Sequence, residues 1–221
     1  MTDIFSPVQL GDIALANRIV MAPMTRDRAG PADEPTDIMV EYYRQRASAG
    51  LIVTEGTQPS AVGKGYWRTP GIHSEEQVAG WRKVADAVHA EGGRIVVQLM
   101  HVGRAAVQAN KDADAETIAP SAIPCPDPIP GPDGVPVPTV MPRALETDEI
   151  AGVVADYVAA ARNAIRAGLD GVELHCASGY LPMQFLSSNS NQRTDRYGGP
   201  AENRVRFVGG VLEAMAQAIG P

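Results

Sequence analysis

The fold is decided by the stretch Arg94-Ile-Val-Val-Gln-Leu-Met-His101. It begins with a short, almost continuous run of apolar residues, which is typical of a strand buried on both faces of a sheet. Gly92-Gly93 precede it and follow a segment with helical periodicity, as glycine commonly does just past a helix end. Polar side chains begin at Gln98, where the apolar run ends. The stretch therefore predicts a helix that leads into a buried strand with hydrogen-bonding groups at its end.

The same unit recurs along the chain. Three further apolar runs lie at residues 18–21, 51–54 and 171–174. Segments with helical periodicity lie at residues 36–49, 74–91 and 147–167, each followed by glycine. Ser74 and Gln77 have capping-box spacing, and Thr147 can cap the third helix. Strands that alternate with helices predict parallel βαβ units with right-handed crossovers, and a short hairpin at 8–15 precedes them.

We therefore expect a single α/β domain over residues 1–221, with the fold of a (β/α)8 TIM barrel. The chain would supply an N-terminal hairpin and about the first four βα units, because no fifth strand follows a last helical stretch at 201–219. A complete barrel takes about 250 residues and eight strands. An open four-stranded sheet is the alternative, although both its edges would be unpaired. We expect a second chain or a second copy to supply the missing strands.

Residues 102–146 form a long segment that is rich in proline between Pro124 and Pro138. A segment of this length inside a domain is commonly a functional lid or a disordered excursion. It follows the carboxyl end of a predicted strand, which in barrels is the active-site side. We therefore expect a long proline-rich loop or a capping subdomain above the site, with a flexible surface loop as the alternative.

The charge balance limits the partners that the protein can have. With 19 Lys and Arg against 26 Asp and Glu, the formal net charge is −7, which disfavours nucleic acid and anionic membranes as partners. No apolar run approaches the roughly 18 residues of a membrane span, and the first residues lack the apolar run of a signal peptide. Two cysteines without a motif spacing do not make a disulfide framework. We expect a cytoplasmic protein.

Polar and small residues follow the predicted strands at the point where each strand ends. The carboxyl ends of parallel strands meet at one mouth of a barrel, so these residues can line one pocket: Thr25, Gly56, Gln98, His175, Ser178 and Tyr180. Gln98 carries a flat amide with an acceptor and donors, which suits the edge of a planar heterocycle. Thr25 adds a hydroxyl donor, and Gly56 permits close approach of the backbone. Each group taken alone is also typical of a satisfied polar residue at a strand end.

Around these residues the sequence resembles the Old Yellow Enzyme family. The stretches that carry the resemblance include Asn17-Arg-Ile-Val-Met-Ala-Pro-Met-Thr-Arg26 and Gln98-Leu-Met-His-Val-Gly-Arg104, with further matches at 41–46, 69–73, 171–175, 179–186, 191–199 and 202–204. The resemblance spans nearly the whole chain and covers the N-terminal part of a typical member. It implies an FMN-dependent (β/α)8 barrel that reduces the C=C bond of small α,β-unsaturated carbonyl or nitro compounds, with NADPH or NADH as reductant.

The resemblance also implies roles for individual residues. Those implied in cofactor binding are Pro23, Met24, Thr25, Gly56, Gln98 and His175. Those implied in substrate binding are Met100, His175, Ser178 and Tyr180. His175 would donate a hydrogen bond to the activating oxygen of the substrate. Tyr180 would supply the proton, since a phenol stays protonated at neutral pH.

Two positions depart from the pattern of the family. Ser178 stands where the family has Asn or His, so we expect the paired donor to be weaker or bridged by water. Met100 stands where tryptophan is common, and we expect this smaller, adaptable side chain to admit bulkier substrates. The family's basic residue beside the flavin and its phosphate site lie on later strands of the barrel.

Two other functions are open to this sequence. One is a non-catalytic half-barrel, an assembly fragment or a binding module without flavin. The other is a metal-dependent hydrolase of barrel fold, because His101, His175 and Glu55 all follow strands. These three lack the short spacing of a ligand pair, so we expect no metal site. Cys176 is interpreted as a small space-filling residue, with a nucleophile as the alternative.

Overall fold

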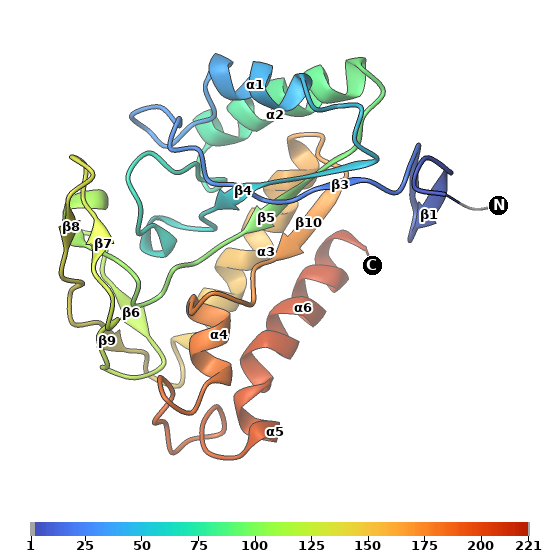
Figure 1. The fold of residues 1–221 in the computed structure, drawn as a ribbon. Coiled ribbons are helices and arrows are strands. Elements are labelled where there is room, and N and C mark those ends of the chain that lie inside the picture. Colours follow the sequence, from blue (N-terminus) through green and yellow to red (C-terminus); the bar gives the residue numbers. More distant parts are fainter. Residues whose placement is uncertain (1–2, 221) are drawn as a thin grey trace.

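The computed structural model of the protein describes residues 3–220. Its centre is a parallel sheet with the strand order β10-β5-β4-β3, formed by β3 (Val20–Met21), β4 (Leu51–Thr57), β5 (Ile95–Leu99) and β10 (Gly171–Leu174) (Figure 1). All four apolar runs of the sequence contribute a strand, and the order in the sheet follows the order along the chain. This is the arrangement that successive right-handed βα units of a barrel produce.

The helices bury one face of this sheet. They are α1 (Asp37–Arg44), α2 (Glu75–Ala90), α3 (Ile150–Arg166) and α6 (Arg206–Ile219), and Figure 1 shows α1 beside α2 and α3 beside α6. Strand residues such as Ile52 and Val97 pack here against fully buried aromatic side chains such as Trp81 and Tyr157. Each large apolar side chain buried in this way stabilises the fold by about 1.5–3 kcal/mol. This face therefore supplies most of the core.

The other face of the sheet is covered only in part. Leu51, Val53 and Val96 alternate along β4 and β5 with the helix-facing residues, as the strand period of two requires. They pack under the predicted hairpin, which is confirmed as β1 (Val8–Leu10) and β2 (Ile13–Leu15). Beside them lies a hollow of about 610 Å³ that β10 and α6 also line.

Some details of the helices differ from the prediction. α1 is shorter than expected, because turns replace its last part before β4. The prediction that Thr147 caps α3 is wrong, since its hydroxyl donates to Asp195 and α3 has no side-chain cap. The predicted helix at 201–219 is divided at Val205 into α5 (Ala201–Arg204) and α6. The capping box of α2 is confirmed.

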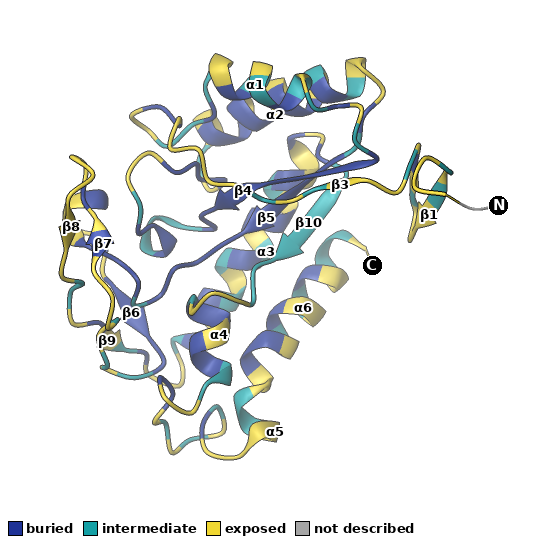
Figure 2. Ribbon diagram, in the orientation of Figure 1, coloured by how far each residue is buried: buried dark blue, intermediate teal, exposed yellow. Residues whose placement is uncertain are grey.

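Residues 102–146 carry small elements of their own. They include a 3-10 turn at Gln108–Asn110, the parallel pair β6 (Ile118–Ala119) and β9 (Arg143–Ala144), and the antiparallel pair β7 (Ile129–Pro130) and β8 (Pro136–Val137). Figure 2 shows exposed residues around β8 and buried residues where the segment joins the body of the molecule. The buried ammonium of Lys111 in this segment donates to the carbonyl of Val62 at 3.0 Å. Val62 lies in another 3-10 turn, Ala61–Gly63, which follows β4.

No helix among residues 3–220 has both the length and the apolar character that crossing a membrane requires.

Candidate functional site

The site begins at a bulge in β4. From Val53 to Gly56 the chain advances three residues, whereas β5 advances two from Val96 to Gln98 opposite them. One extra residue in a strand breaks the alternation of its side chains and re-aims the side chains beyond it. As a result Gly56 pairs directly with Gln98, and the side chain of Glu55 is withdrawn into the protein.

Gln98 is held on both sides by neighbouring strands. Its backbone N–H donates to the hydroxyl of Thr54 on β4 at 3.1 Å. Its side-chain Nε2 donates to Oε1 of Glu173 on β10 at 2.7 Å, and the two residues are direct partners in the parallel register. A hydrogen bond to a carboxylate is stronger than one between neutral groups. Glu173 was not predicted from the sequence, although it lies only two residues before His175.

Gly56 lies against Met100. A Cβ atom at Gly56 would stand 2.5 Å from the sulfur of Met100, so no residue with a side chain fits there without moving Met100. Met100 is buried, and the half-buried Tyr66 and Tyr180 pack against the small cluster to which it belongs. Met100, which was predicted to shape the substrate pocket, therefore lies between a predicted cofactor contact and the predicted proton donor.

His175 is presented as a neutral hydrogen-bond donor. Its Nδ1 accepts the backbone N–H of Ala177 at 3.2 Å, which places the ring proton of the neutral imidazole on Nε2. Burial lowers the pKa of His175, only partly offset by the nearby carboxylate of Glu173. The ring of Tyr180 stands edge-on to the imidazole with 4.9 Å between the ring centres. These two predicted catalytic residues are thus side by side.

Tyr180 has a phenolic partner that the sequence did not reveal. Its hydroxyl donates to the hydroxyl of Tyr66 at 3.0 Å, and the two rings meet edge to face. Burial raises the pKa of Tyr66 well above its usual value, and the hydrogen bond from Tyr180 adds to the increase. The phenol of Tyr66 is therefore protonated at neutral pH. Tyr66 comes from the loop after β4, so only the fold could bring the two together.

A short helix anchors the loop that carries Tyr180. Tyr180 lies directly before α4 (Leu181–Leu186), which was not predicted, and the side chain of Gln184 in this helix is fully buried. Its Nε2 donates to the carbonyls of Val102 at 2.9 Å and Gly179 at 2.7 Å, and its Oε1 accepts the N–H of Arg104 at 3.2 Å. One amide thus joins the loop after β10 to the loop after β5.

Ser178 differs from the other site residues in its backbone. It has φ of 56°, in the left-handed region, and Gly179 follows with φ of 75°. Its side chain is exposed and makes no hydrogen bond within residues 3–220. Among residues other than glycine, Asn and Asp adopt this conformation most readily. A serine therefore holds a strained position with its hydroxyl free.

The residues after β3 are held by a buried carboxylate. Thr25 and Met24 are exposed and Pro23 is half-buried, but the next N–H, of Arg26, donates to Oε2 of Glu55 at 3.1 Å. The other oxygen of Glu55 accepts the hydroxyl of Tyr43 at 3.2 Å. Glu55 is 1% exposed, and burial raises its pKa to about 7. It therefore ties the predicted flavin-contacting segment 23–25 to β4.

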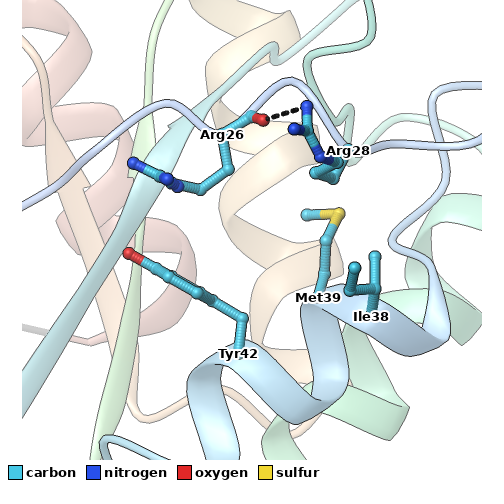
Figure 3. Close-up of a pocket in the computed structure, with 5 residues that line it drawn as sticks. All are labelled: Arg26, Arg28, Ile38, Met39 and Tyr42. Carbon is cyan, nitrogen blue, oxygen red and sulfur yellow. Dashed lines mark hydrogen bonds between the residues drawn. The ribbon is translucent and has the colours of Figure 1, made fainter.

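The side chains of Arg26 and Arg28 turn toward α1 instead of the strand ends. Figure 3 shows them opposite Ile38, Met39 and Tyr42 around a small cavity of about 160 Å³. The guanidinium of Arg26 lies 5.5 Å from the ring centre of Tyr42, and Arg28 donates to the carbonyl of Arg26 at 3.0 Å. These contacts shape the loop after β3 from its outer side.

The remaining candidate residues have structural roles. His101 is fully buried, and desolvation lowers its pKa to about 3, so it is neutral. Cys176 is half-buried against the main core, and burial raises the pKa of its thiol, which opposes the thiolate that a nucleophile needs. Within residues 3–220 no three His, Cys, Asp or Glu side chains are grouped so as to hold a metal ion. The hydrolase alternative therefore has no observation in its favour.

The structure thus brings Gly56 on β4 and Gln98 on β5 together with Met100 just after β5, and His175 and Tyr180 together after β10. The side chain of Thr25 makes no hydrogen bond to either group within residues 3–220. Parallel strands of barrel type, with an amide, an imidazole and two phenols at their carboxyl ends, define the N-terminal part of a (β/α)8 barrel with a candidate active site at its mouth.

The chain belongs to the NADH:flavin oxidoreductase / NADH oxidase family, whose model matches residues 3–221. The "Probable flavin mononucleotide-dependent alkene reductase" of Leishmania infantum is 48% identical over an alignment 222 residues long that covers 97% of this chain and 60% of that protein. The structure of morphinone reductase superposes with a TM-score of 0.94 at 48% identity, over 100% of this chain and 60% of that one. A second structure, morphinone reductase in complex with tetrahydroNAD, gives a TM-score of 0.93 at 48% identity, over 99% of this chain and 61% of that one.

These findings confirm the resemblance to the Old Yellow Enzyme family and the barrel fold class. The chain spans about 60% of the length of the relatives it matches.

Proposed function

We propose that the protein acts as an FMN-dependent ene-reductase on α,β-unsaturated carbonyl or nitro compounds, with NADPH or NADH as the reductant. The observation that carries this proposal is the pairing of His175 with Tyr180, 4.9 Å apart between ring centres. A neutral N–H donor and a protonated phenol side by side are the two groups that reduction of an activated C=C bond needs beyond a hydride source.

The residues present fit the pyrimidine edge and the plane of a flavin. Gln98 offers a carbonyl oxygen and a second N–H beyond the one used by Glu173, a donor–acceptor pair that matches an imide edge. Gly56 and the backbone of Pro23, Met24 and Thr25 would approach the ring, and His175 would border it. When bound, the flavin supplies the hydride and its redox chemistry. The relatives named for flavin mononucleotide and for tetrahydroNAD support this choice of cofactor and reductant.

His175 would bind the activating oxygen of the substrate. Negative charge develops on that oxygen as the β-carbon is reduced, and a preorganised donor stabilises the charge more in the transition state than in the ground state. One such donor is worth about 3 kcal/mol. The Nδ1 contact with Ala177 keeps the Nε2–H available for this purpose. The free hydroxyl of Ser178 would assist directly or through a water.

Tyr180 would deliver the proton to the α-carbon. Its hydroxyl already donates to Tyr66, so it must turn from this partner toward the substrate. Tyr66 would then donate to the phenolate that Tyr180 becomes, which stabilises the product of the proton transfer. Met100, packed between Gly56 and the tyrosine pair, would set the width of the substrate pocket.

We also propose that the active form contains further barrel strands, supplied by a second chain or a second copy. The outer edge of β10 pairs with no strand among residues 3–220, and the hollow of about 610 Å³ beside it is lined by apolar residues of β4, β5 and α6. An unpaired parallel edge next to an apolar hollow accepts another strand readily. We propose that the segment 102–146 is a capping subdomain beside the site. The site lies at the carboxyl end of β5.

The test is spectroscopic. The purified protein is incubated with FMN, then given NADPH or NADH without air, then an enone such as 2-cyclohexenone. The expected result is bound yellow flavin that bleaches with the nicotinamide and regains its absorbance with the enone. Protein that stays colourless with added FMN, whether alone or with the strands that complete the barrel, would establish the non-catalytic half-barrel instead. The mass of the intact particle shows in each case whether a second copy or chain is present.

A further inference from the structure

Glu173 stands at the centre of the site but takes no part in the proposed chemistry. It is half-buried on β10, next to Gln98 on β5 in the register and two residues before His175, which directly follows β10. Its carboxylate accepts the Nε2–H of Gln98 at 2.7 Å, and it borders the hollow on the inner face of the sheet. A carboxylate inside a barrel needs a reason, because an ionised group is rarely placed on an inner face without a partner.

We propose that Glu173 is a positioning residue that fixes the rotation of the Gln98 amide and so determines which of its atoms faces the flavin. The proposal rests on the proposed function and adds a residue to it. A side-chain amide has two orientations, related by a half-turn, that fill the same space but exchange its donor for its acceptor. A site that reads a ring edge with such a group must select one of them.

The chemistry of the carboxylate makes the selection. An ionised carboxylate accepts hydrogen bonds and cannot donate them, so only the N–H side of the amide can face it. The flipped orientation would place the Gln98 oxygen against Glu173, which exchanges a charge-assisted hydrogen bond for a repulsive contact. The backbone of Gln98 is fixed independently, because its N–H donates to Thr54. Because the backbone and Nε2 of Gln98 are both held by hydrogen bonds, its Oε1 and second N–H can point in only one direction.

The direct consequence is a cofactor site that exists before the cofactor arrives. If the amide were free to turn, only part of the population would be competent to bind, and the apparent dissociation constant would rise by the reciprocal of that fraction. Glu173 therefore acts through Gln98 and needs no contact with the ring.

The test is a set of variants compared by FMN titration. Glu173→Ala should weaken FMN binding about fivefold, since the amide loses its preferred rotation and part of its restraint. Glu173→Gln should weaken it only about twofold, because its own amide can meet Gln98 in either orientation. In a Gln98→Ala background, Glu173→Ala should have almost no effect, as expected for two residues that act as a unit. Glu213→Ala, on the exposed side of α6, controls for the loss of one negative charge.

A second measurement needs no flavin. The side-chain amide protons of Gln98, assigned by their loss in Gln98→Ala, should exchange slowly with solvent in the wild type and faster in Glu173→Ala. Equal FMN affinity for the Ala and Gln variants of Glu173, or the same effect of Glu173→Ala with and without Gln98, would overturn the proposal. So would unchanged exchange of the Gln98 amide. If the wild type binds no FMN but the amide exchange behaves as expected, the proposed function fails and the positioning by Glu173 stands.

Discussion

The two halves of the site are built in different ways. The half proposed to hold the flavin lies on strands: Gln98 is bonded to β4 and β10, and the segment 23–25 is tied to β4 through Glu55. The half proposed to hold the substrate lies on loops, with two consecutive left-handed residues at Ser178 and Gly179. Rigid elements preserve a geometry, whereas loops on a scaffold can change without loss of the fold. The contrast suggests a constant cofactor and a variable substrate.

Among the tests of this contrast, the largest effect is expected from a substitution of Tyr180. Tyr180→Phe should slow oxidation of the reduced flavin by an enone about 10²–10³-fold, because the general acid is lost. Flavin reduction by NADPH and the affinity for FMN should stay within about twofold, since Tyr180 lies in the loop half. Stopped-flow absorbance of the two half-reactions gives both rates. Equal loss in both would mean that Tyr180 supports the whole site and that the two halves are not separate.

The second test concerns the buried carboxylate in the strand half. Burial raises the pKa of Glu55 to about 7, so the folded state holds its proton where the unfolded state, with a pKa near 4.5, has released it. This group therefore lowers stability as pH rises from about 4.5 to 7, and by about 3 kcal/mol above that window.

Glu55→Gln should remove the loss of stability that ionisation of Glu55 causes at higher pH. Its amide oxygen can still accept the N–H of Arg26. The variant should gain stability over the wild type at pH 8 but not at pH 4.5, as measured by urea unfolding at both pH values. Asp86→Asn, a carboxylate on the exposed side of α2, is the matched control. An identical pH dependence of the wild type and Glu55→Gln would show that Glu55 is ionised at little cost in the fold.

The sequence was informative about one half of the site and much less about the other. Continuous apolar runs placed β4, β5 and β10, and the polar residue at the end of β5 marked Gln98. The partner of Gln98 could not be predicted, because the pairing with Glu173 depends on the register between β5 and β10. The bulge that turns Glu55 away from the inner face of the sheet could not be predicted either, because no local sequence pattern indicates it.

The loop half shows a different limit. Tyr66 and Tyr180 are 114 residues apart, and their contact depends on how two loops fold over the strand ends. The helix α4 escaped prediction because six residues are too few to show a helical period. The prediction for Thr147 failed because a hydroxyl near a helix start has other partners, here Asp195. Local sequence patterns thus predicted the secondary-structure elements and the ends of the strands. Contacts between residues far apart in the sequence create the site.

A third test examines the phenol pair within the loop half. Tyr66→Phe should slow the enone-dependent step about fivefold, the value of one hydrogen bond, because the developing phenolate of Tyr180 loses a donor. Tyr42→Phe, on α1, removes a hydroxyl away from the loop half and should have no effect. The pH profile of the step should also shift, because the proton donor loses its hydrogen bond to the Tyr66 hydroxyl. A rate and a pH profile equal to those of the wild type would make the contact between the two phenols incidental.

The smallest expected effect belongs to Ser178, and it bears most directly on the comparison. Asn tolerates φ of 56° better than serine, so Ser178→Asn should raise the free energy of unfolding by about 0.5 kcal/mol. Ala177→Asn, one residue earlier and outside the left-handed region, should bring no such gain. The same Asn would add an amide donor beside His175, which should tighten binding of carbonyl substrates without changing FMN affinity. A change in FMN affinity would mean that strain in the loop reaches the strands, and the two halves would then have to be treated as one.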